Sequence, residues 1–124
     1  DLTVVTYGRM VGESLKAAGQ LGADGLEVEV IDLRTLQPLD HETIIDSVKR
    51  TNQCVVVHEA VRFGGLGAEI ASQIQEHAFD YLDAPVGRVG APFSPVPFTP
   101  TLEKAYVPDA ARIAEQIRST AGMR

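Results

Sequence analysis

The sequence predicts an α/β fold of three layers, α/β/α, with a mostly parallel open sheet of about five strands. Two observations lead to this class. Short β-branched runs alternate along the chain with longer segments whose apolar residues recur every three or four positions. Such alternation favours parallel strands joined by right-handed crossovers, with helices on both faces of the sheet. Residues 1–124, of which 44% are apolar, are expected to form a single domain around one core.

The first half of the chain contains two strand and helix units. Residues 3–7 form a β-branched run that ends at a glycine, and residues 10–21 carry apolar side chains at helical spacing. Residues 27–33 alternate polar and apolar side chains before becoming fully apolar, which predicts a second strand. Pro38 limits that strand because it lacks a backbone donor, and Asp40 is the expected N-cap of the second helix.

The second half begins with a third unit and then becomes less regular. Residues 53–58 form the most apolar strand candidate, and a glycine cluster at residues 64–67 leads into a third helix. Residues 85–90 allow one more short strand. Four prolines then fall within nine positions, which predicts an extended arm over residues 91–108 that lies along the surface. Asp109 precedes a closing amphipathic helix.

Composition restricts the classes of function. The net charge of −6 and the lack of a lysine and arginine cluster argue against nucleic acid or an anionic membrane as a partner. No run approaches the roughly 18 apolar residues that a membrane-spanning helix needs, and we expect a cytoplasmic protein. The single cysteine, Cys54, lies in an apolar run and is expected to be a buried, unreactive thiol. Because the chain does not start with methionine and a strand-like run begins at residue 3, we expect a piece of a longer chain. The last helical pattern fades into residues 119–124, so we expect this piece to be the C-terminal domain.

The strongest candidate for chemistry is His58, together with Glu59 and Arg62, at the carboxyl end of the predicted third strand. Ligands bind at that edge of open α/β sheets. An imidazole and a carboxylate are suited to acid–base catalysis, but neighbours on a strand point to opposite faces. The glycines at residues 64–67 match neither the dinucleotide nor the P-loop pattern, so a tight turn with close packing is favoured over phosphate binding.

Other catalytic classes find no matching motif. His41, His58 and His77 lie on separate elements without metal-ligand spacing, so no metal site is predicted. No serine stands in a Gly-x-Ser-x-Gly elbow, and His58 occupies the position where a phosphoacceptor domain carries aspartate. We therefore predict no catalytic, cofactor-binding or metal-binding residue in this chain. His58, Glu59 and Arg62 stay as candidates for the rim of an active site or for a regulatory site.

Five segments in order give the chain a wider resemblance. They are LTVVTYG at residues 2–8, VIDLRTLQPLD at 30–40, VVVHEA at 55–60 with GLGAEI at 65–70, APVGRV at 84–89, and PVPF at 95–98 with residues 102–103 and 106–108. In this order they resemble the C-terminal domain of the transketolase-like family, and specifically the β subunit of the decarboxylating component of 2-oxo acid dehydrogenase complexes. The resemblance covers essentially the whole chain.

The resemblance implies a function in assembly. Such a domain helps two β subunits to dimerise within an α2β2 heterotetramer. Thiamine diphosphate and magnesium are held between the α subunit and the N-terminal domain of the β subunit, so this chain is expected to bind neither and to be inactive alone. The resemblance also implies docking of the subunit-binding domain of dihydrolipoyl acyltransferase, a basic domain that the charge of −6 would complement.

The sequence leaves the 2-oxo acid and two other classes of function open. Residues 58–60 and 75–77 look more like branched-chain than pyruvate or acetoin members, whereas residues 91–98 depart from the commoner branched-chain form, which has Asp-Thr-Pro in this region. The first alternative is a free-standing flavodoxin-like module that binds a nucleotide or flavin near Gly8 or the glycines at 64–67. The second is a pure assembly domain unrelated to thiamine enzymes.

Overall fold

The computed structural model describes residues 1–122. The strands are β1 (Leu2–Thr6), β2 (Val28–Asp32), β3 (Cys54–Val61) and β4 (Gly87–Ala91). The helices are α1 (Met10–Ala23), α2 (His41–Thr51), α3 (Leu66–Ala78), α4 (Pro100–Tyr106) and α5 (Ala110–Thr120), and a short 3-10 helix, η1 (Phe79–Tyr81), follows α3.

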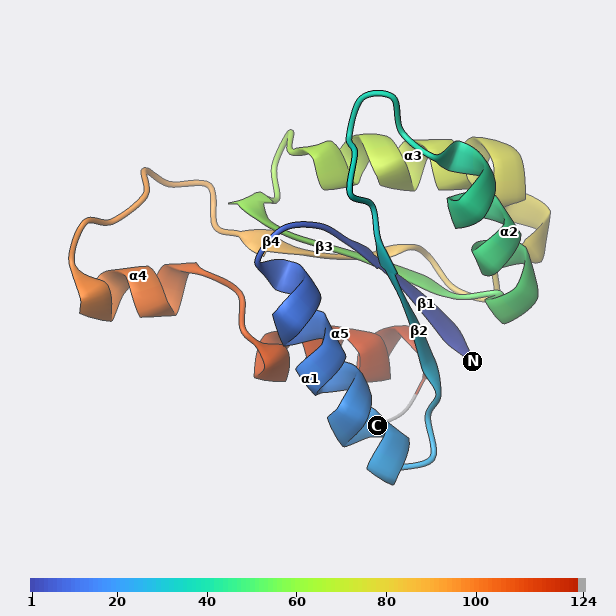
Figure 1. Cartoon of the computed structure of the whole chain (residues 1–124), viewed down its shortest axis with the longest axis horizontal. Coiled ribbons are helices and arrows are strands. Elements are labelled where there is room, and N and C mark those ends of the chain that lie inside the picture. The colour runs from blue at the N-terminus through green and yellow to red at the C-terminus, as the bar shows by residue number, and fades with distance from the viewer. Residues whose placement is uncertain (123–124) are drawn as a thin grey trace.

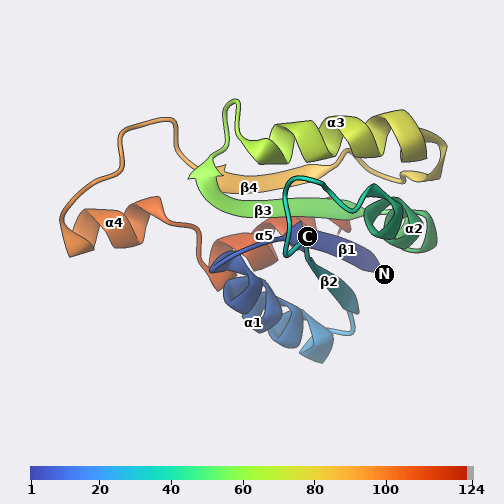
Figure 2. The same ribbon diagram turned by 45° about the horizontal axis from the view of Figure 1, so that its top comes forward.

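The four strands form one parallel sheet between two layers of helices. Their order is β2-β1-β3-β4, so β1 and β3 are central. Helices α2 and α3 cover one face, and α1 and α5 cover the other (Figure 1). Figure 2 shows the same layers in a second view. The predicted three-layer fold with a parallel sheet is therefore confirmed.

The central strand β1 is buried along its whole length. It pairs with a neighbour on each side and is covered on both faces, which explains its run of β-branched residues. A buried hydroxyl needs hydrogen-bond partners. The Thr3 hydroxyl lies 2.7 Å from both the Ser47 hydroxyl and the Thr51 hydroxyl, and these contacts tie α2 to the centre of the sheet.

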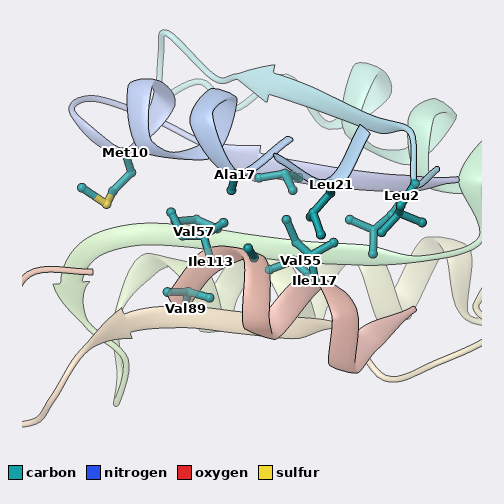
Figure 3. Close-up of a cluster of buried hydrophobic side chains, with 12 residues drawn as sticks. Leu2, Met10, Ala17, Leu21, Val55, Val57, Val89, Ile113 and Ile117 are labelled. Carbon is teal, nitrogen blue, oxygen red and sulfur yellow. The ribbon is translucent and has the colours of Figure 1, made fainter. Parts of the chain in front are cut away.

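The core lies in two parts, one on each face of the sheet. Figure 3 shows the part beneath α1 and α5, where Met10 and Leu21 of α1 lie near Ile113 and Ile117 of α5 over the side chains of β3. The other part lies beneath α2 and α3. It contains the following buried residues: Val5, Leu33, Ile44, Val48, Cys54, Val56, Ile70, Ile74 and Ala78. The predicted burial of Cys54 is confirmed, and that burial raises the pKa of its thiol to about 12.

Two helices begin just after aspartates that cap them: Asp40, which the sequence predicts as an N-cap, and Asp109, which precedes the predicted closing helix. The Asp40 carboxylate accepts a hydrogen bond of 3.1 Å from the backbone N–H of Thr43 at the start of α2. The Asp109 carboxylate accepts one of 2.9 Å from the N–H of Arg112 at the start of α5. Each aspartate satisfies a backbone donor that the first turn of a helix leaves free.

The strand count is lower than predicted. Residues 1–122 form four strands rather than about five, because the chain after β4 does not return to the sheet as a strand. Three prolines, at positions 92, 95 and 97, lack the backbone donors that a further ladder would need. Within the same range, no helix is both long and apolar enough to cross a membrane.

The arm, residues 91–108, differs from its prediction in two ways. It is free of helix as far as Thr99, but α4 begins at Pro100, so the prediction of an extended segment as far as residue 108 is wrong. Pro100 is the first residue of α4, a position where its missing N–H needs no partner and its fixed φ suits the helix. The arm also projects from the body of the domain instead of lying along it (Figure 1).

Candidate functional site

The carboxyl end of β3 is irregular, and His58 lies at that irregularity. The pairing between β3 and β4 shifts in register between Val57 and Val61, as in a β-bulge. His58 Nδ1 donates a hydrogen bond of 2.9 Å to the carbonyl oxygen of Ala60 within the shifted stretch. Because a carbonyl oxygen only accepts, this contact places the ring proton on Nδ1. The His58 side chain thus supports the local bend of β3.

Glycines from two segments enclose the His58 ring, which leaves the residue only 2% exposed. A Cβ built on Gly67 would lie 2.6 Å from His58 Nε2, and one on Gly90 would lie 2.9 Å from His58 Cε1. A Cβ built on Gly65 would lie 3.1 Å from His58 Cε1, and Gly64 turns the chain with a φ of +68°. The interpretation of the glycine cluster as a tight turn with close packing is confirmed. The ring itself fills the space between Gly67 and Gly90.

The surroundings of His58 favour its neutral form. Burial lowers the pKa of the imidazole, and the nearby Arg88 charge lowers it further, although the hydrogen bond to Ala60 acts in the opposite direction. The Tyr7 ring lies next to it, with the two ring centroids 6.2 Å apart. Burial also raises the pKa of the Tyr7 hydroxyl, with a smaller contribution from Glu59. His58 is therefore a neutral packing residue with little access to solvent.

Glu59 and Arg62 are exposed, unlike His58. The alternation of sides along a strand predicts that His58 and Glu59 lie apart, and their opposite burial agrees with this. In this chain they do not form an acid–base pair around a common surface. Arg62, just after β3, instead faces a cavity that it shares with arginines from β4 and α5.

That cavity was not predicted from the sequence. Its volume is about 380 Å³, and its charged lining residues are Arg62, Arg88, Arg112 and Glu115. Arg62 follows β3, Arg88 lies on β4 and Arg112 lies near the start of α5, so Arg62 and Arg112 meet although they are 50 positions apart. Only the parallel pairing of β3 with β4 and the packing of α5 against this part of the sheet bring the three arginines together.

The described residues bring together no ligand set for the magnesium ion that accompanies thiamine diphosphate. Between residues 1 and 122, no group of three His, Cys, Asp or Glu side chains is placed to hold a metal. His41 begins α2 and His77 lies near the end of α3, while His58 is enclosed at the end of β3. We therefore derive no catalytic step through that cofactor in this chain.

The arm carries a concentration of exposed apolar side chains. Phe98 is 100% exposed and Phe93 is 74% exposed, and Val96 and Leu102 are also mostly exposed. The Phe93 ring lies against Phe63, with ring centroids 5.0 Å apart. Exposed apolar residues that are grouped rather than scattered mark surfaces that bind other molecules. The arm is thus the part of this chain best suited to contact a partner.

Comparison with known proteins agrees with this geometry. The profile described as the C-terminal domain of transketolase matches residues 1–113, and the chain belongs to that family. A solved structure described as a split-gene transketolase, an inactive β4 tetramer, has a TM-score of 0.79 and 27% identity, and it covers 99% of this chain and 39% of that one.

Particular relatives narrow the similarity to β subunits. The chain is 48% identical over 120 residues to the β subunit of the pyruvate dehydrogenase E1 component of Staphylococcus epidermidis. It is 46% identical over 120 residues to the β subunit of acetoin:2,6-dichlorophenolindophenol oxidoreductase of Cupriavidus necator. Each match covers 97% of this chain, which spans 37% and 36% of the two relatives. The predicted resemblance to such β subunits is confirmed.

Proposed function

We propose that this chain is the C-terminal assembly domain of the β subunit of a thiamine-diphosphate-dependent 2-oxo acid dehydrogenase. The intact enzyme would decarboxylate a 2-oxo acid oxidatively and transfer the acyl group to a lipoyl carrier. The observation that carries the proposal is the exposed aromatic arm on a domain of the transketolase C-terminal family. The chain alone would be inactive, because in such enzymes the cofactor and its metal are held by the α subunit and the N-terminal domain of the β subunit.

The arm supports an assembly function on physical grounds. Burying an exposed phenylalanine side chain is worth about 1.5–3 kcal/mol, so the arm gains stability when a partner covers it. Phe93 and Phe98 have large, exposed side chains and belong to neither part of the core. Aromatic residues of this kind form the centres of protein interfaces. We infer that the arm contacts other parts of the β subunit or neighbouring subunits.

The partners we propose are the α subunit and a second β subunit in an α2β2 heterotetramer. The subunit-binding domain of dihydrolipoyl acyltransferase is a further proposed partner, since the net charge of −6 would attract a basic domain. Thiamine diphosphate and magnesium would bind in the intact enzyme, outside this chain. We further propose that the intact enzyme is cytoplasmic.

The substrate proposal rests on the relatives. The two β subunits described above belong by name to a pyruvate enzyme and an acetoin enzyme. We propose pyruvate as the substrate, because it is a 2-oxo acid; acetoin carries no carboxyl group, so an acetoin enzyme would cleave its substrate without decarboxylation and is the alternative. The branched-chain interpretation of residues 58–60 and 75–77 stays a prediction, and the two relatives do not support it. Activity of the intact enzyme with pyruvate, acetoin and 3-methyl-2-oxobutanoate distinguishes the three.

A second proposal concerns the edge of the sheet at His58, Glu59 and Arg62. Arg62 lines a cavity, and Glu59, three positions earlier in the sequence, is exposed. Both side chains are therefore accessible for a role at the rim of an active site or in regulation of the intact enzyme. The test is the steady-state kinetics of intact enzyme carrying His58→Ala, Glu59→Ala or Arg62→Ala. Unchanged kcat and KM in all three variants would contradict the proposal.

The main proposal is tested by calorimetric titration of this chain with the subunit-binding domain of the same organism's acyltransferase. Light scattering records the oligomeric state at low and moderate salt. We expect a dimer that binds the domain more weakly as salt rises, because screening weakens charge attraction. The variant Phe98→Ser should weaken self-association or binding, and Leu15→Ser, an exposed apolar change on α1, is the matched control.

Other outcomes point to the two alternatives. A dimer that does not bind the subunit-binding domain at either salt would leave a scaffold alone, with docking on other parts of the subunit. An absorbance spectrum with flavin or nucleotide bands after purification would favour the flavodoxin-like module. A monomer that binds no domain and is indifferent to Phe98→Ser would contradict the assembly proposal.

A further inference from the structure

Three arginines from separate segments line one cavity beside β4. Arg62 follows β3, Arg88 lies on β4, and Arg112 lies on α5, and they surround the backbone of Gly90. We propose that this cavity binds the phosphate group of a small molecule, with the three guanidinium groups as its ligands. The site lies within this chain, and the proposal does not depend on the assembly function.

Backbone contacts hold the three arginines in place. The Arg62 N–H donates a hydrogen bond of 2.9 Å to the carbonyl oxygen of Ala91, which continues the pairing of β3 with β4. Arg88 Nη1 donates to the carbonyl oxygen of Arg62 at 3.3 Å, and Arg112 Nη2 donates to that of Gly90 at 3.4 Å. Each guanidinium has five N–H donors, so these single, long contacts leave most of the donors free for a ligand.

The three arginines also differ from others in the chain by lacking a carboxylate partner. Within residues 1–122, Arg34, Arg50 and Arg118 form ion pairs of 2.8–3.0 Å with aspartate or glutamate. The same range contains no ion pair for the three arginines of the cavity. A chain with a net charge of −6 thus gathers three unpaired positive charges at one point. An oxyanion would neutralise them.

The charge of the cavity suits a phosphate dianion. Glu115 also lines it and repels an anion, so three positive groups and one negative group leave a surplus of two positive charges. Gln116 and Ser119 line the same cavity and add neutral hydrogen-bonding groups. The planar fork of a guanidinium matches the oxygens of a phosphate and binds them through two parallel hydrogen bonds.

A second cavity continues from the first and indicates a phosphate ester. Its volume is about 540 Å³, and it shares the three arginines and Gly90 with the first cavity. Phe63 and Phe93 line this second cavity with their exposed rings. An aromatic surface next to a phosphate site provides a place for the organic part of a monoester. We therefore expect an aryl or similar phosphate monoester to bind more tightly than inorganic phosphate.

The test is a nuclear magnetic resonance titration of the 15N-labelled chain with inorganic phosphate and, separately, with phenyl phosphate. We expect saturable shifts at the amide of Gly90 and at the Nε–H groups of the three arginines. Arg88→Gln and Arg112→Gln should each weaken the affinity about tenfold or more, the effect of losing one charge-assisted contact. Arg50→Gln, whose guanidinium is paired with Glu29, is the matched control and should leave the affinity unchanged.

Several outcomes overturn the proposal. Shifts that do not saturate, or that are as large at Arg50 as at the cavity, would indicate only general attraction of anions. Equal phosphate affinity of the Arg50→Gln and Arg112→Gln variants would also indicate only general attraction of anions. Far-ultraviolet circular dichroism verifies that each variant is folded, and Arg88→Lys, which keeps the charge but not the fork, should bind with intermediate affinity. Because no partner takes part in this titration, its failure leaves the assembly proposal unaffected.

Discussion

The body of the domain and the arm treat their apolar residues in opposite ways. In the body, β1 is buried along its length and α5 inserts Ile113 and Ile117 into the core (Figure 3). In the arm, Phe93 and Phe98 lie in solvent. Both regions are rich in apolar side chains, so composition alone does not distinguish them. The body is thus stabilised by contacts within this chain, whereas the exposed apolar residues of the arm leave their surface free for contacts with other molecules.

The largest loss of stability is expected from a substitution in the body of the domain. Ile117→Ala should lower the free energy of unfolding by about 2–5 kcal/mol, because it removes buried atoms and leaves a cavity between α5 and the sheet. Phe98→Ala in the arm is the matched variant and should change it by less than about 0.5 kcal/mol. Urea denaturation followed by circular dichroism measures both. Similar losses in the two variants would mean that the arm also supports the fold.

A smaller loss of stability is expected at Gly90, where the body of the domain is closely packed. In Gly90→Ala the new Cβ would lie 2.9 Å from the carbonyl oxygen of Ala60 and from His58 Cε1, and backbone atoms cannot move aside easily. We expect a loss of about 1–3 kcal/mol in the free energy of unfolding. Gly12→Ala in α1 meets nothing within 4 Å and should stabilise the helix by about 0.5–1 kcal/mol. Equal thermal melts for the two variants would argue against close packing at Gly90.

The smallest expected effect is the contribution of His58 to the pH dependence of stability. The pKa of His58 is lowered in the folded protein, mainly by burial, so the unfolded chain binds a proton more readily there. The stability that this difference contributes is present above the ordinary histidine pKa of about 6.5 and is lost as the pH falls through the lower, folded value. His58→Gln should therefore flatten the decline of the melting temperature below about pH 6.5. An unchanged pH profile in this variant would mean that other groups cause the decline.

Much of the fold could be predicted because its signals are local. The β-branched run of β1, the caps Asp40 and Asp109, and the helical spacing in α3 each depend on a few neighbouring residues. The helix α4 could not be predicted from the density of prolines, since Pro100 begins a helix although prolines inside one break it. What decided the structure was the position of the proline within the element.

The candidate sites were harder to predict than the fold. His58 was found because it follows an apolar strand at the edge where ligands bind, but its enclosure by Gly65, Gly67 and Gly90 depends on the bulge in β3. The arginine cavity was missed because Arg88 and Arg112 have no shared motif. Their proximity depends on the register of β4 against β3 and on the packing of α5, both long-range features.

The packing of α1 against α5 determines when this domain can finish folding during synthesis. Glu13 Oε2 of α1 accepts a hydrogen bond of 3.0 Å from the N–H of Ala110, 97 positions later. Until α5 has been synthesised, the apolar surface of α1 and of the sheet stays exposed to water. The growing chain is therefore partly folded and prone to aggregate. Contacts of such high sequence separation also slow folding. Chaperones that hold nascent chains would therefore be of most use to this domain until α5 leaves the ribosome.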